Sequence, residues 1–183
     1  MSAKQKGEEA FKRLDKINAE LFTLTYGSIV MQLIKDFDTV EEVNEQLDEM
    51  GYNIGVRLVE EFLAKSGTQC NRNLRDAAET IAKVGFKMFL GVSAQVPPGS
   101  WSADGNEFSL VLEDNPLTEF VELPEEYSAL WYSNILCGVI RGALEMVQMD
   151  VECKQTRCTL KGDDATELRV FFKGMIKDEA PAF

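Results

Sequence analysis

The order of the predicted elements indicates a single α+β domain built on an antiparallel sheet. Helical spacing of apolar residues dominates the first half of the 183-residue chain, and alternating strand patterns follow in the second half. Hydrophobic residues make up 45% of the chain and charged residues 27%, which is typical of a folded globular protein. We find no linker and no internal repeat, so the sequence predicts one domain.

The first half of the chain predicts helices over 20–37, from Thr39 onward, and over 71–90. Thr39 and Glu42 have the spacing of a capping box, Gly51 should end or bend the helix that they start, and a further helix should close at Ser66-Gly67. The apolar residues expected to face inward are Leu21, Leu24, Ile29, Leu33 and Phe37, then Val40, Val43, Leu47 and Met50, then Ile54, Leu58 and Phe62, and finally Leu74, Ala77, Ala78, Ile81, Ala82, Gly85, Met88 and Phe89.

The second half begins with a loop through Pro97-Pro98-Gly99, because this stretch cannot hold regular structure. Phe108, Leu110 and Leu112 alternate as a strand, and Phe120-Val121 suggests a short second one. Pro124 should open a long helix that reaches Val147. Residues 149–160 and 166–174 then predict a hairpin around Lys161-Gly162-Asp163-Asp164.

Composition excludes several classes of function. The chain has no histidine, which removes the Ser-His-Asp triad, histidine-ligated haem and the usual zinc sites. Its formal charge of −12 argues against a protein that coats nucleic acid. The polar N-terminus lacks the pattern of a signal peptide, and no run of 18 apolar residues suggests a membrane span. We therefore expect a cytoplasmic protein with free thiols and no bound metal.

One segment is locally basic despite the acidic total. Residues 62–91 hold five basic residues against Asp76 and Glu79, a net charge of +3. Such a face can contact an anionic membrane surface, and the alternative is a solvated face without a partner. The basic residues are Lys65, Arg72, Arg75, Lys83 and Lys87.

Cys70 is the cysteine most favoured for reaction. It precedes the predicted 71–90 helix, with Arg72 and Arg75 within about one turn, and both features favour the thiolate. A thiolate at the edge of an amphipathic helix is a plausible acylation site. An acyltransferase would also need a general base, and only Asp76 and Glu79 lie nearby, so we assign no catalytic residue.

Long stretches of the chain resemble a known family. They include ELFTLTYGSIV (20–30), MGYNIGVRLVEEFLAKS (50–66), IAKVGFKMFLGV (81–92), FSLVLEDNPLTEFVELPE (108–125), YSNILCGVIRGALEMVQM (132–149) and TLKGDDATELRVFF (159–172). Together they resemble the Bet-three-type subunit of the TRAPP (transport protein particle) vesicle-tethering complex, over about residues 18–175.

The resemblance implies an α/β plait over 18–175, a flexible segment over 1–17 and an acidic tail over 176–183. It implies a non-catalytic core subunit that forms a homodimer, or a heterodimer with related subunits, through its early helices. The assembly would act in ER-to-Golgi transport, peripheral at cis-Golgi and endoplasmic reticulum membranes, and promote nucleotide exchange on a Rab-family GTPase. Asp178 and Glu179 would lie near that GTPase.

The resemblance also assigns a lipid. The position that carries a palmitoyl thioester in the family corresponds to Cys70, and the acyl chain would enter a tunnel lined by Ile81, Val84, Gly85 and Met88. Arg72, Arg75, Lys83 and Lys87 would face the membrane. Self-acylation of Cys70 is then the one reaction expected of the chain. The alternative is a stand-alone domain that binds a lipid or small ligand reversibly.

Overall fold

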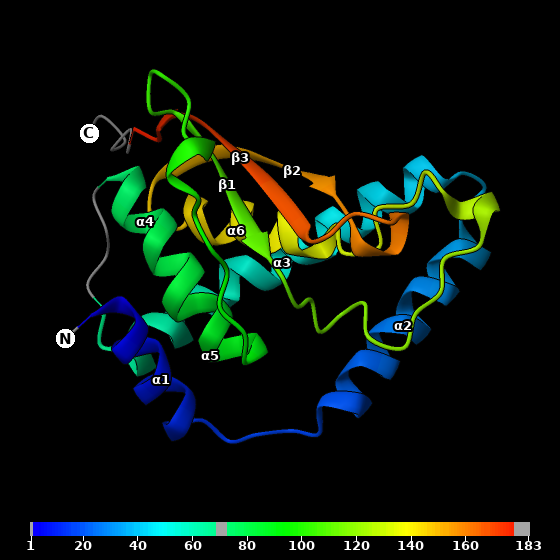
Figure 1. Ribbon diagram of the computed structural model, residues 1–183, viewed down its shortest axis with the longest axis horizontal. Coiled ribbons are helices and arrows are strands. Elements are labelled where there is room, and N and C mark those ends of the chain that lie inside the picture. Colours follow the sequence, from blue (N-terminus) through cyan, green and yellow to red (C-terminus); the bar gives the residue numbers. More distant parts are fainter. Residues whose placement is uncertain (1, 69–72, 178–183) are drawn as a thin grey trace, which may run out of the picture.

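The computed structural model describes residues 2–68 and 73–177 and shows an α+β domain with an antiparallel sheet, as predicted (Figure 1). The strands β1 (Glu107–Leu112), β2 (Met149–Arg157) and β3 (Thr166–Met175) pair in the order β1-β3-β2. The principal helices are α1 (Ala3–Arg13), α2 (Ala19–Asp36), α3 (Val40–Ser66), α4 (Leu74–Thr80), α5 (Phe86–Leu90) and α6 (Ile135–Glu145). A π-helical turn, η1 (Ile81–Gly85), joins α4 to α5, and the 3₁₀ turns are η2 (Pro98–Ser100), η3 (Glu125–Tyr127) and η4 (Thr159–Lys161).

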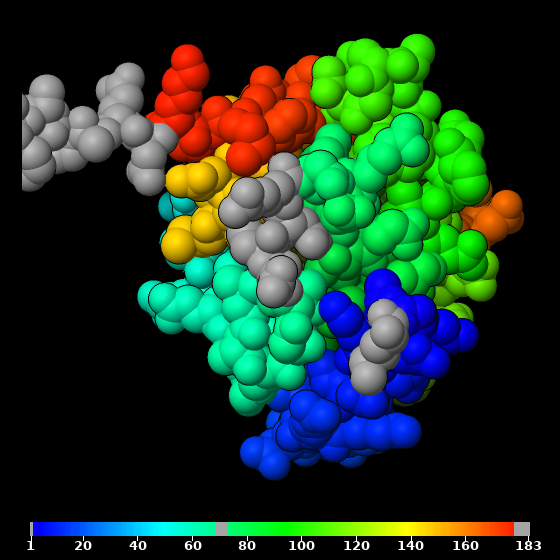
Figure 2. All heavy atoms as spheres, turned by 90° about the vertical axis from the view of Figure 1, so that its left-hand side faces the viewer, coloured from blue at the N-terminus to red at the C-terminus, as the bar shows by residue number. Residues whose placement is uncertain are grey.

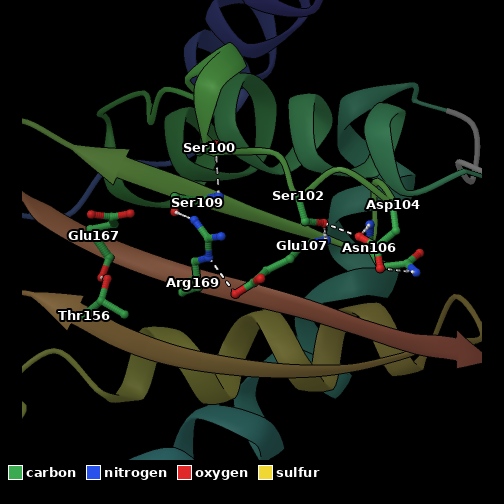
Figure 3. Close-up of polar contacts among 9 residues, drawn as sticks. All are labelled: Ser100, Ser102, Asp104, Asn106, Glu107, Ser109, Thr156, Glu167 and Arg169. Atoms are coloured by element: carbon green, nitrogen blue, oxygen red, sulfur yellow. Dashed lines mark hydrogen bonds and ion pairs between the residues drawn. The ribbon is translucent and has the colours of Figure 1, made fainter.

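The two faces of the sheet differ in chemistry. The face toward α6 is apolar and fully buried at Phe108, Leu110 and Leu168. On the other face, Arg169 of β3 donates hydrogen bonds to Glu107 Oε1 (2.7 Å) and to Ser109 Oγ (3.0 Å) of β1 (Figure 3). The hydrogen bond from Arg169 holds the pKa of Glu107 below its usual value. These contacts join β1 to β3 in the register Ser109–Arg169.

Four glycines bring α3 and α6 into backbone contact. Gly51 and Gly55 on α3 face Gly138 and Gly142 on α6, and a Cβ at any of the four would overlap a backbone carbonyl oxygen of the other helix. The alternative that Gly51 ends a helix is therefore wrong. α3 runs unbroken through this position, and the glycine serves the helix crossing instead. The overlapping oxygens belong to Ile135, Val139, Asp48 and Tyr52.

The connection between β1 and α6 also departs from the prediction. Phe120 adopts a left-handed backbone conformation (φ 64°), so Phe120-Val121 forms no strand. Pro124 is followed by the single turn η3, and α6 begins only at Ile135. Asn44 of α3 explains the irregular path, since its side chain accepts from the Trp131 amide (2.8 Å) and donates to the Ala129 carbonyl (3.2 Å).

Other local predictions are confirmed. Thr39 and Glu42 form a complete capping box, and Gly67 ends α3 in the left-handed conformation (φ 61°). The helical stretch α4–η1–α5 covers the described part of the predicted 71–90 helix, with Asn73 as its N-cap. The segment 1–17, for which we expected flexibility, is not among these confirmed predictions: it contains α1, which is capped by Ser2 and packs on η1 and α5.

Candidate functional site

A cavity of about 480 Å³ lies among α2, α3, α4–η1–α5 and α6. Its wall is apolar, and no charged side chain lines it among the described residues. The Tyr26 hydroxyl donates its hydrogen bond to the Tyr132 carbonyl, and burial raises the pKa of Tyr26 well above its usual value. Each wall element contributes large apolar side chains: Phe22 and Ile29 from α2, Ile54, Leu58 and Phe62 from α3, Ile81 and Phe89 from α4–η1–α5, and Leu136, Ile140 and Leu144 from α6.

The π turn η1 leaves part of this cavity open. Gly85 lies at its end and lines the cavity, and a Cβ built there would meet no other atom within 4 Å. π-helical turns inside longer helices are frequent at functional sites, because they re-aim the residues on either side. A small residue in this turn therefore keeps open a volume that an ordinary side chain would reduce.

The predicted tunnel residues do not all lie on this wall. Ile81 and Gly85 line the cavity, as do Ile54, Leu58 and Phe62, which the sequence placed inward. Val84 and Met88 are buried, at 1% and 3% exposure, but they do not line the cavity. Sequence reasoning missed the contribution of α6. Its apolar periodicity was visible, but periodicity alone does not distinguish a packed core from a hollow one.

Several elements that contribute to the cavity wall meet on one face of the molecule. Figure 2 shows the end of α3, α4, the α6–β2 connection and the end of β3 gathered on this face. Leu63, Ala77 and Val147, which belong to the first three of these elements, also line the cavity. Cys70 lies outside the described residues, and its described neighbours Thr68 and Asn73 flank it at the ends of α3 and α4.

The basic residues that were predicted to face a membrane make contacts within the protein where the structure describes them. Lys83 donates to the Ala94 carbonyl (2.8 Å), and Lys87 donates to the Gly91 carbonyl (3.0 Å) and pairs with Glu8 of α1 (3.3 Å). Arg75 lies 4.8 Å from the Trp101 ring centroid. These contacts hold the positively charged side chains of Lys83, Lys87 and Arg75 against the surface of the protein. Arg72, Asp178 and Glu179 lie outside the described residues.

The other cysteines are buried within the fold. Cys137, Cys153 and Cys158 have free thiols, and the pKa of Cys153 is raised first by its hydrogen bond with Cys137 and then by burial. Raised thiol pKa values disfavour the reactive thiolate. Within the described ranges, no group of three or more acidic or cysteine side chains is arranged to hold a metal ion. None of the described helices combines the length and apolarity that a membrane span requires.

The fold and the cavity define a class of protein: an α+β domain that holds an apolar cavity and carries no recognisable catalytic group among its described residues. The family described as transport protein particle (TRAPP) component matches residues 22–171. The chain belongs to this family.

Similar proteins agree over nearly the whole chain. The "Transport protein particle subunit bet3" of Schizosaccharomyces pombe is 58% identical over 182 residues, covering 99% of this chain and 98% of its own. The "Trafficking protein particle complex subunit 3" of Dictyostelium discoideum is 57% identical over 176 residues, covering 96% and 94%. The crystal structure of subunit 3 from Naegleria fowleri, covalently bound to palmitic acid, matches with a TM-score of 0.85 and 52% identity, covering 90% of this chain and 100% of its own.

Proposed function

We propose that this TRAPP subunit is a structural core component of the tethering complex and carries a palmitoyl thioester on Cys70, with the acyl chain inside the cavity. The observation that carries the proposal is the apolar cavity, whose wall includes Leu63 and Ala77 from the two helices that flank Cys70 in sequence. The similar structure from Naegleria fowleri holds palmitic acid covalently, which supports the same chemistry here.

Burial of the acyl chain has a structural consequence. Each buried methylene contributes roughly 0.8 kcal/mol, so a long chain stabilises the fold when it fills a dry apolar volume. The same chain cannot simultaneously insert into a bilayer. The lipid therefore acts as part of the core, and membrane contact is left to surface charges and to the other subunits of the complex.

Intact mass distinguishes this proposal from reversible ligand binding. We expect the denatured protein to keep a palmitoyl adduct, and neutral hydroxylamine to remove it, because hydroxylamine cleaves thioesters. A lipid that is lost on denaturation alone would instead support a stand-alone lipid-binding domain, which the same apolar cavity also suits.

Gly85→Leu should obstruct the cavity. The new side chain would extend from η1 into space that is now open, so it should compete with the acyl chain. We expect palmitate occupancy, measured by intact mass after palmitoyl-coenzyme A treatment, to fall at least about fivefold while the far-ultraviolet circular dichroism spectrum is retained. Gly99→Ala is the matched control, since a Cβ at Gly99 also meets open space but lies away from the cavity. Full occupancy in Gly85→Leu would contradict this placement of the chain.

We infer that the outer face of α2 binds a second copy of the chain or a related TRAPP subunit. Leu21, Leu24 and Met31 on this face are 63%, 60% and 55% exposed. Residues 21–34 contain no charged side chain, so two copies of α2 can approach without like-charge repulsion. Exposed apolar surface of this kind on one helix is typical of a subunit interface.

Leu24→Glu should weaken this interface. The substitution places a charge in the apolar face, and we expect the dimer dissociation constant to rise at least about tenfold in sedimentation velocity experiments. Leu24 is exposed, so the melting temperature of the monomer should change little. An unchanged dissociation constant would place the interface elsewhere.

We also propose that the assembled complex promotes nucleotide exchange on a Rab-family GTPase in ER-to-Golgi transport, with the subunit cytoplasmic and peripheral at cis-Golgi and endoplasmic reticulum membranes. Family membership supports this role. Arg72, Arg75, Lys83 and Lys87 remain the proposed membrane-facing residues, although the last three have partners within the protein.

Deletion of residues 176–183 tests the proposed contact of the acidic tail, Asp178 and Glu179, with the GTPase. We expect the reconstituted complex to release nucleotide several-fold more slowly, because the tail no longer contributes to the contact. Asp178→Asn/Glu179→Gln is the charge-only control. Unaltered exchange by the deletion variant would remove the tail from the mechanism.

A further inference from the structure

Helix α2 separates the cavity from the proposed partner face. Phe22, Tyr26 and Ile29 line the cavity, with Tyr26 buried and Phe22 and Ile29 37% and 36% exposed, whereas Leu21 and Leu24 are 63% and 60% exposed. A single helix is roughly 10 Å across with its side chains. Any change in the packing of the inner side of α2 is therefore only one helix diameter away from the outer side.

Helix α2 is anchored to the rest of the domain by core packing and by two polar contacts. Near its C-terminal half, Val30 is 1% exposed and belongs to the main core. In the N-terminal half, Thr23 Oγ1 donates to the Pro116 carbonyl (2.9 Å) and the Tyr26 hydroxyl donates to the Tyr132 carbonyl. The α2 side chains that line the cavity, Phe22, Thr25, Tyr26 and Ile29, lie on both sides of these contacts, so an occupant of the cavity would pack directly against α2.

α2 also lies far from the expected point of entry. In Figure 1, α4 begins on the left of the molecule and α2 lies on the right. The cavity is lined at both places, by Ala77 of α4 and by Phe22 of α2. An acyl chain that enters beside α4 reaches α2 only if it is long enough to cross the domain.

We propose that α2 couples the two sites, so that an acyl chain long enough to reach α2 strengthens the binding of a second copy of this chain to the outer face of α2. The proposal rests on the acylation and dimerisation proposed above. The physical cause is a loss of flexibility in α2. The acyl chain contacts the inner side of the helix and orders it, so less conformational entropy is lost when the partner binds to the outer side. Coupling of this kind is reciprocal, so the partner also stabilises the filled cavity.

Chain length provides the test. The Cys70 thiol is converted to a mixed disulfide with octyl or hexadecyl methanethiosulfonate, and the untreated thiol serves as the reference. Cys137, Cys153 and Cys158 are buried, and intact mass verifies a single addition. The dimer dissociation constant is measured by sedimentation velocity, and amide hydrogen exchange is followed in α2 and α6.

We expect the hexadecyl chain to lower the dimer dissociation constant about tenfold, within the 5–150-fold range that is typical of coupled sites, and the octyl chain to change it less than about twofold. Both chains should slow exchange in α6, and only the hexadecyl chain should slow exchange in the N-terminal half of α2. In Leu24→Glu, where the partner face is damaged, the hexadecyl chain should still protect α2, but less strongly than in the wild-type dimer.

The outcomes distinguish a failure of the coupling through α2 from a failure of the proposed acylation. Equal dissociation constants for all three forms, with α6 protected by the hexadecyl chain, would overturn the coupling and leave the cavity as the site of the lipid. The coupling would also be overturned if octyl and hexadecyl chains lowered the dimer dissociation constant equally, or if no dimer formed in any of the three forms. If neither chain slowed amide hydrogen exchange in α6, the proposed function itself, with the acyl chain inside the cavity, would be overturned.

Discussion

Gly138→Ala should destabilise the domain strongly. The new Cβ would overlap the Asp48 carbonyl oxygen and approach the Tyr52 amide, both of which belong to the backbone of α3. Backbone cannot rotate away as a side chain can, so the helices must separate. Overpacking costs about 1–3 kcal/mol where side chains can yield, and we expect the upper end or more here, about 3 kcal/mol.

A loss of about 3 kcal/mol corresponds to a fall of roughly 6–12 °C in melting temperature for a domain of this size. Differential scanning calorimetry measures it. Gly85→Ala is the matched control, because Gly85 is also helical but its Cβ would meet open space, and alanine favours a helix by about 1 kcal/mol over glycine. Equal melting temperatures for Gly138→Ala and the wild type would show that the α3–α6 crossing is looser than described.

Cys70→Ser should remove the acyl chain and leave the cavity empty. At about 0.8 kcal/mol per buried methylene, burial of only about four methylenes already contributes about 3 kcal/mol. We therefore expect the melting temperature of the palmitoylated protein to exceed that of Cys70→Ser by roughly 10 °C. Protein expressed in eukaryotic cells supplies the acylated form, which intact mass verifies.

Hydroxylamine provides the internal control for this comparison. Treatment should lower the melting temperature of the acylated wild type to that of Cys70→Ser, and it should leave the variant unchanged. If the two proteins melt together while palmitate is present on one and absent from the other, the acyl chain contributes nothing to the fold. Close agreement of the treated wild type with the variant would attribute the difference to the lipid rather than to the serine.

The features that the sequence predicted correctly are local ones. The capping box at Thr39 and Glu42, the left-handed end of α3 at Gly67 and the alternation of Phe108, Leu110 and Leu112 each depend on residues close together in the chain. The β2–β3 hairpin follows for the same reason, although its connection contains the turn η4.

The errors arise where distant segments decide the local structure. Gly51 has the sequence features of a helix breaker, but its partner is α6, more than 80 residues further along the chain. Likewise, Asn44 of α3 holds the backbone near Trp131 in an irregular path where helical spacing predicts a helix. Neither contact leaves a signal in the immediate sequence neighbourhood.

The candidate site shows a related limit. Apolar periodicity predicted that Ile54 and Leu24 both face inward, yet Ile54 lines a cavity and Leu24 is 60% exposed. Core, cavity wall and partner face all require apolar side chains, so one sequence pattern serves three purposes. The exposed α2 face and the hollow behind it become distinguishable only when the helices are placed in space.

We propose above all that the cavity holds an acyl chain joined to Cys70. A crystal structure of the protein purified from eukaryotic cells tests it most directly. We predict continuous electron density of aliphatic shape from Cys70 Sγ past Ile81 and Gly85 into the cavity, with a mass increase equal to one palmitoyl group. A Cys70 thiol directed into solvent, beside a cavity closed by its own side chains, would contradict the account.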